Sequence, residues 1–205
     1  MTGRIFAISF IFICTTVAWF VLGGTVVNRT NNSEGSLRTQ VGQLWGSPLL
    51  QKAPTVTHTK SHPVFIPATK STAARTDTTF TTEPTQLEAS AIDVGLQLDY
   101  RQKGLLWYST YRVVFKGRYR IVNPDGEAHP FTFTFTFPNT GAVYDNFHMH
   151  IGNREVRTIN LASGKIEETF PIAAGATEEI LITYESNGME KWGYNFGQDV
   201  NQVRN

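Results

Sequence analysis

Apolar residues gather first in one uninterrupted run near the N-terminus. The run begins at Ile5 and ends at Val27, and none of its 23 residues is charged. A helix of about 20 residues, rising 1.5 Å per residue, crosses a hydrocarbon core of roughly 30 Å. The pattern therefore predicts a transmembrane helix at residues 5–27, preceded by a short cytoplasmic segment at residues 1–4.

A cleaved signal peptide is the alternative interpretation of this run. Signal peptides usually have an apolar region of about 7–15 residues before a small-x-small cleavage site. The run here is longer, and no Ala-x-Ala sequence directly follows it. Arg4 and Arg29 flank it on opposite sides, so the positive-inside tendency acts on few charges. The polar sequence that follows is typical of an exported segment and favours an N-terminus inside the cell.

Residues 28–90 contain few large apolar residues, and Thr, Ser, Pro and Lys dominate the second half of this stretch. Such a composition buries too little surface to offset the entropy of ordering, so we expect a polar tether. An apolar island at residues 41–50 contains Trp45, Gly46 and Pro48. We expect this tryptophan-glycine motif to dock on the chain's own domain. The alternative is a tryptophan at the membrane interface.

Beyond residue 90 the apolar positions alternate with a period of two, which is the pattern of a strand with one buried face. The clearest case is residues 105–121, followed by the turn sequence at residues 123–126. One face of this strand is predicted to be core and carries Trp107, Tyr111, Val113, Phe115, Tyr119 and Ile121. The other face is predicted to be wet and carries Arg112, Lys116, Arg118 and Arg120.

A second strand is predicted at residues 131–137, where four phenylalanines alternate with three threonines and demand an opposing sheet. Further strands are predicted at residues 143–151, 155–161, 165–170, 179–185 and 192–196, with turn sequences between them. Short strands with turns every ~8–12 residues indicate a mainly β domain, an antiparallel β-sandwich at residues 91–205. A membrane barrel is the competing architecture, but it would not need a helical anchor.

The charge of the chain argues against nucleic-acid binding, and its cysteine content argues against a fold held by disulfides. The chain has 18 Lys and Arg against 17 Asp and Glu, so it lacks the concentrated positive field that nucleic-acid binding requires. The single cysteine, Cys14, lies inside the apolar run, so no intrachain disulfide can form. The fold must therefore depend on packing alone.

The best metal-like pair is His148 and His150, which share one face of a predicted strand. Asp145 has the opposite parity, and no third ligand lies at a suitable spacing. Parity places Val143, Phe147, Met149 and Ile151 on the core side and leaves both histidines outward with Tyr144. We therefore expect a solvated strand face rather than a metal site. Gly-x-Ser-x-Gly, Ser-x-x-Lys and phosphate-loop patterns are absent from the sequence, so no catalytic residue is expected either.

The basic stripe, defined as Arg112, Lys116, Arg118 and Arg120, is the candidate face for an anionic partner. The alternative is a wet face whose cations pair with carboxylates of neighbouring strands. Glu167, Glu168, Glu178 and Glu179 are the candidates for such pairing.

Two segments resemble the CreD-type family of bacterial inner-membrane proteins: residues 101–111 (RQKGLLWYSTY) and residues 44–48 (LWGSP). The resemblance implies an N-terminal helix, a tryptophan-glycine motif and a β-rich periplasmic region, followed by several further membrane helices. Because the sequence ends at Asn205 without such helices, the resemblance implies a truncated member. The family is associated with the response to envelope-active agents and supplies no catalytic residues.

These patterns together predict a non-enzymatic protein of the cell inner membrane, single-pass as given, that contributes to envelope integrity or stress response through binding. The expected partners are the lipid bilayer and either another envelope protein or an anionic membrane component. No cofactor or metal is expected. The alternative is a metal-dependent or other hydrolase acting on envelope polymers, which would depend on His148 and His150.

Overall fold

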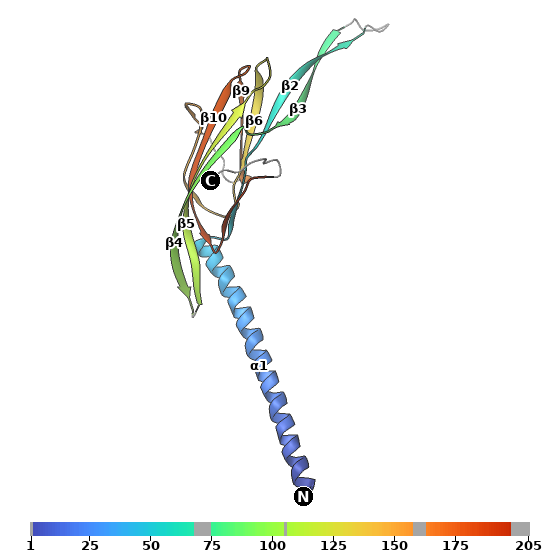
Figure 1. Cartoon of the computed structure of the whole chain (residues 1–205), viewed down its shortest axis with the longest axis vertical. Coiled ribbons are helices and arrows are strands. Elements are labelled where there is room, and N and C mark those ends of the chain that lie inside the picture. Colours follow the sequence, from blue (N-terminus) through green and yellow to red (C-terminus); the bar gives the residue numbers. More distant parts are fainter. Residues whose placement is uncertain (1, 68–74, 105, 158–162, 198–205) are drawn as a thin grey trace.

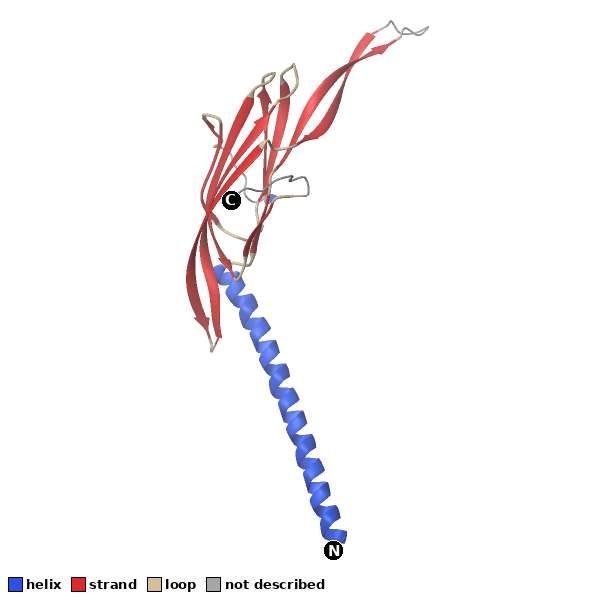
Figure 2. Ribbon diagram, in the orientation of Figure 1, coloured by secondary structure: helices blue, strands red, loops and turns tan. Residues whose placement is uncertain are grey.

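A computed structural model describes residues 2–67, 75–104, 106–157 and 163–197. Its longest element is helix α1, Thr2–Trp45, which extends away from a body of strands (Figures 1 and 2). The apolar part of α1 is exposed, and by length and composition it can cross a membrane. The helix does not end with the apolar run at Val27 but continues to Trp45.

The polar tether expected at residues 28–90 is not what the structure shows, because regular elements occupy most of this stretch. After α1 come strands β1 (Leu49–Lys52), β2 (Thr55–Ile66), β3 (Arg75–Thr85) and the start of β4 (Ala89–Lys103). Composition misled the prediction in two ways. Threonine, which is abundant here, favours strands once a partner strand is present. The last turns of α1 are stabilised by packing, since Val41 is buried with Tyr108 and Met189.

Two antiparallel sheets make up the body. The larger has the order β4-β5-β10-β7-β8, with β5 at Leu106–Val122, β7 at Tyr144–Ile151, β8 at Arg154–Glu155 and β10 at Thr177–Met189. The smaller has the order β3-β2-β6-β9, with β6 at His129–Thr136 and β9 at Lys165–Ile172. A separate pair joins β1 to β11 (Trp192–Asn195) in parallel, so the prediction of antiparallel pairing is correct for the two larger sheets only.

The inward faces of the two sheets share one aromatic core. Phe115 of β5 lies 6.2 Å from Phe135 of β6 between ring centroids, and Tyr119 lies 5.8 Å from Phe133. The predicted alternation is confirmed from Tyr111 to Ile121 and from Phe131 to Phe137, where every expected core residue is buried. Trp107 is an exception, because it lies beyond the core near the tip of the β4–β5 hairpin and is 66% exposed.

The predicted parity of β7 is wrong at its first residues. Val143 is exposed, and Tyr144 packs on Phe137 with 4.5 Å between ring centroids. The cause is a bulge: Asn146 has a φ of 49°, and the register with β10 shifts between Thr183 and Glu185. One extra residue exchanges the two faces of a strand. Burial raises the pKa of the Tyr144 hydroxyl to about 12.

Other boundaries differ from the prediction in detail. Of the strand expected at 155–161, only Glu155 is in a strand among the described residues, as the second residue of β8, and residues 158–161 lie outside the described residues. The turn expected at residues 187–188 is part of β10. The hairpin of β2 and β3 forms a long arm, because β2 pairs with β6 only as far as His58 and beyond it pairs with β3 alone (Figure 1).

Candidate functional site

The end of α1 is held against the strands by the sequence Trp45-Gly46-Ser47-Pro48. Gly46 has a φ of 103°, and its amide donates to the Gly42 carbonyl at 3.0 Å, which closes the helix. A methyl group on the Cα of Gly46 would overlap the carbonyl oxygen of Asn187 in β10. Glycine is therefore needed here both for the left-handed turn and for the close approach of two backbones.

Side chains of α1 that precede Gly46 also attach the helix to the strands. The Arg101 guanidinium of β4 lies over the Trp45 ring, 4.2 Å from its centroid. Arg38 of α1 forms an ion pair with Glu190, which follows β10. Cation–π contacts of this kind are worth about 0.5–1 kcal/mol at exposed sites. The structure thus places Trp45 and Gly46 of the candidate docking motif against the chain's own strands.

A cleft of about 620 Å³ opens beside this contact, between the last turns of α1, the loop after β6 and the end of β10. Pro48 of the motif lines it together with Arg38, Leu44, Asn139, Val143 and Asn187. The Asn139 amide donates to the Ser47 hydroxyl, which ties the loop to the helix end. A lining of amides, apolar side chains and one guanidinium is suited to holding a small polar or anionic group.

All four residues of the basic stripe lie on the exposed face of β5, and acidic side chains lie among them on this face. Arg112 pairs with Glu185, and the pKa of that carboxyl is lowered by a hydrogen bond from Asn146 and by Arg112. Arg120 lies 3.8 Å from Glu88. Lys116 is directly opposite Asp93 in the register, and Arg118 forms no ion pair with any described residue. The stripe therefore has the mixed charge of a wet sheet face. Of the carboxylates expected from the sequence, Glu179 stands directly opposite Arg120 in the register, and the ion pairs are formed by Glu185 and Glu88 instead.

The two histidines of β7 also lie on this face. His148 is paired with Glu155 at 3.5 Å, and the backbone registers it against Thr183. His150 stands opposite Leu181 on one side and Glu155 on the other. Among the described residues, no group of three or more His, Cys, Asp or Glu side chains is arranged to hold a metal ion.

Five titratable residues meet at the end of the core opposite α1 and form a distal polar cluster that the sequence analysis missed. Its members are His58 and Lys60 of β2, Glu83 of β3, Asp125 of the loop after β5, and His129 of β6. The Asp125 carboxylate lies 2.9 Å from Lys60 Nζ and 3.2 Å from His129 Nε2. The His58 ring stacks on Phe131, so the cluster covers the edge of the aromatic core.

The ion pair at the centre of this cluster changes two pKa values. The hydrogen bond with Lys60 lowers the pKa of the Asp125 carboxyl, and the same bond raises the pKa of the Lys60 ammonium. The sequence contains one usable signal, because His58 and Lys60 share the parity of buried Val56. Their partners come from distant segments, and no local pattern reveals those pairings.

Comparison of the chain with models of known protein families, with curated proteins and with solved structures finds no match. Its functional interpretation therefore depends on the geometry of its own residues.

Proposed function

We propose that this chain is a membrane-anchored protein of the cell inner membrane that acts by binding an envelope component rather than by catalysis. Its N-terminus lies inside the cell, and its strands lie in the periplasm. The observation that carries this proposal is the continuity of α1, whose exposed apolar residues lead without a break into a helix end packed on β5 and β10. An apolar helix with no protein around it is suited to a lipid environment.

The same continuity implies a rigid spacer. Residues 28–45 add about 27 Å of helix at 1.5 Å per residue. A flexible tether would let the strands move freely, whereas a helix held by Gly46, Arg38 and Arg101 keeps them at a set distance from the bilayer. The arm of β2 and β3 points away from the N-terminal end of α1 (Figure 1). In this placement the arm is presented towards the periplasm.

The strands themselves are best described as an antiparallel β-sandwich. In support, β5 and β10 of one sheet and β6 and β9 of the other contribute to a single buried cluster. Two sheets that bury their inner faces in this way offer outer faces, edges and loops to partners. The resemblance of residues 101–111 to CreD-type proteins supports an envelope setting, and envelope integrity or stress response remains the corresponding expectation.

Orientation can be tested in intact cells with a membrane-impermeant maleimide. In a Cys14→Ser background, a cysteine at Ser61 in the arm should react from the periplasm, and a cysteine at Thr2 should react only after lysis. Ser61 is exposed, so its reactivity reports location rather than burial. Reaction of the Thr2→Cys variant alone in intact cells would overturn the proposed orientation.

The binding role can be tested by truncation after Trp45, which keeps the anchor and removes every strand. The expected result is greater sensitivity to envelope-active agents, with the Asp145→Ala variant as a control of unchanged fold. Membrane fractionation should find both chains at similar levels. Unchanged sensitivity on truncation would count against the binding role without affecting the anchor.

A further inference from the structure

We propose that the tip of the β4–β5 hairpin and the adjacent face of α1 form a site for the headgroups of anionic phospholipids. This inference rests on the proposed membrane placement and extends it. It assigns lipid binding to the membrane-side end of the strands rather than to the basic stripe, whose cations alternate with acidic residues.

The hairpin lies beside α1 and points along it towards the apolar segment (Figure 1). Leu37 of α1 is at the level of the hairpin tip, because a Cβ placed on Gly104 would lie 3.7 Å from the Leu37 side chain. Tyr108 and Leu106 of β5 pack with Val41 and Leu37 of α1. These contacts hold the tip at a defined position on the helix.

The height of the tip follows from helix geometry. Leu37 is ten residues beyond Val27, so the tip lies about 15 Å above the end of the apolar run along the axis. The run itself is about 35 Å long, which exceeds a hydrocarbon core of roughly 30 Å and matches a tilt of about 30°. If α1 tilts towards the hairpin, and the sheet stands about 10 Å from the axis, the tip is roughly 8 Å above the hydrocarbon. The headgroup layer is about 5–7 Å thick, so long side chains at the tip reach it.

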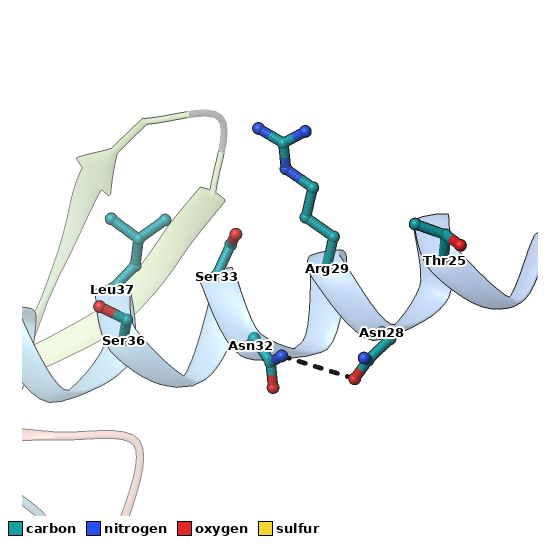
Figure 3. Close-up of a pocket in the computed structure, with 7 residues that line it drawn as sticks. All are labelled: Thr25, Asn28, Arg29, Asn32, Ser33, Ser36 and Leu37. Carbon is teal, nitrogen blue, oxygen red and sulfur yellow. Dashed lines mark hydrogen bonds between the residues drawn. The ribbon is translucent and has the colours of Figure 1, made fainter. Parts of the chain in front are cut away.

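Two cations lie on the sides of α1 and the hairpin that face each other. Arg29 projects from the side of α1 that faces the hairpin, on the same side as Ser33 and Leu37 (Figure 3). It is two residues beyond Val27, at the level of lipid phosphates. Lys103 lies at the tip, on the hairpin face that packs on α1. Neither cation forms an ion pair with a described residue, in contrast to Arg38 and Arg101.

Polar groups suited to a phosphodiester line the helix between these cations. A shallow depression runs along residues 25–37 and is lined by Thr25, Asn28, Arg29, Asn32, Ser33, Ser36 and Leu37 (Figure 3). Glu34 is the only carboxylate in residues 28–45, and it lies about 100° around the helix from Ser33. A guanidinium, an ammonium and hydroxyl donors match the oxygens of a phosphate group.

Aromatic residues on the other face of the hairpin agree with this placement. Trp107 and Tyr100 are diagonal neighbours on the face away from α1, and they are 66% and 62% exposed. Tryptophan and tyrosine are enriched at membrane interfaces because each ring has an apolar body and a polar edge.

The test uses the full chain in lipid nanodiscs with a Cys14→Ser background and a bimane label on a cysteine at Gln102, which is opposite Trp107. Quenching by brominated lipids is measured as phosphatidylglycerol is titrated into phosphatidylcholine. We expect quenching that rises with phosphatidylglycerol and falls with salt. The double variant Arg29→Ala, Lys103→Ala should need at least fivefold more phosphatidylglycerol for half-maximal quenching, because each cation near an anionic surface contributes about a fivefold preference.

The matched control is Arg118→Ala with Arg120→Ala, which removes two cations from the basic stripe and should leave the titration unchanged. A label at Asn28 separates the two proposals. Quenching at Asn28 but not at Gln102 overturns the headgroup site and leaves the anchor standing, whereas no quenching at Asn28 overturns the anchor. The site is also overturned if the label at Gln102 is protected from quenching to a degree that depends on the density of protein in the bilayer and not on the fraction of phosphatidylglycerol. That result would identify this face as a contact between copies of the chain.

Discussion

The contact between Gly46 and β10 gives the most direct test of how the helix joins the strands. Substitution Gly46→Ala places a methyl group against the backbone of Asn187 and Gly188, in a residue with a φ of 103°. Left-handed backbone costs a non-glycine residue about 1–2 kcal/mol, and overpacking against fixed atoms adds about 1–3 kcal/mol. We therefore expect a loss of about 3 kcal/mol in the free energy of unfolding.

Thermal unfolding of the full chain in detergent, followed by near-UV circular dichroism, measures this effect. For a domain of this size, 1 kcal/mol shifts the Tm by about 2–4 °C, so the expected decrease is about 6–12 °C. Gly126→Ala is the matched control, because a Cβ at Gly126 meets no atom within 4 Å and should change the Tm little. Equal Tm values for the two variants would refute the close backbone approach at Gly46.

Three further predictions concern the strands. The folded-state pKa of Asp125 is below its ordinary 3.8, so its ion pair with Lys60 stabilises the fold above that pH and is lost as pH falls through the folded pKa. In chemical denaturation at decreasing pH, the free energy of unfolding should therefore fall more steeply for the wild type than for Asp125→Asn. Replacing residues 62–79 by Asn-Gly, which joins the paired residues Ser61 and Phe80, should leave the Tm within about 2 °C, since none of the described residues of this distal arm belongs to the core. Asn123 is fully buried and its amide donates to the carbonyls of Glu127, Ile172 and Ala173, so Asn123→Ala should lower the free energy of unfolding by about 2–3 kcal/mol in urea titrations.

The basic stripe and the pair Arg29 and Lys103 differ in how well they suit an anionic partner. The basic stripe is conspicuous in the sequence because its four cations alternate along one strand. In the sheet, Glu185 and Glu88 pair with two of them, and such exposed pairs reduce the field that an anionic partner would meet. Arg29 and Lys103 are far apart in the sequence, and the packing of the hairpin on α1 places both on facing sides of the helix and the hairpin (Figure 3).

Local patterns were sufficient for several elements. The apolar helix follows from a run of 23 uncharged residues, because crossing a hydrocarbon core is a requirement on length and composition alone. The strands containing Phe115 and Phe135 follow from period-two alternation, because successive side chains of a strand point to opposite faces. The burial of these residues agrees with that reasoning.

Non-local contacts decided the rest. The helix extends to Trp45 and the stretch 55–85 forms strands because Val41 finds Tyr108 and because β2 finds β3, and neither partner can be read from composition. Tyr144 turns inward because of a bulge at Asn146 that depends on pairing with β10. Composition and spacing along the chain specify which segments are apolar and with what period. The pairing of these segments, and therefore the charges that meet at the junction of α1 with the strands, follows from the fold, because strand register and helix packing are relations between distant residues.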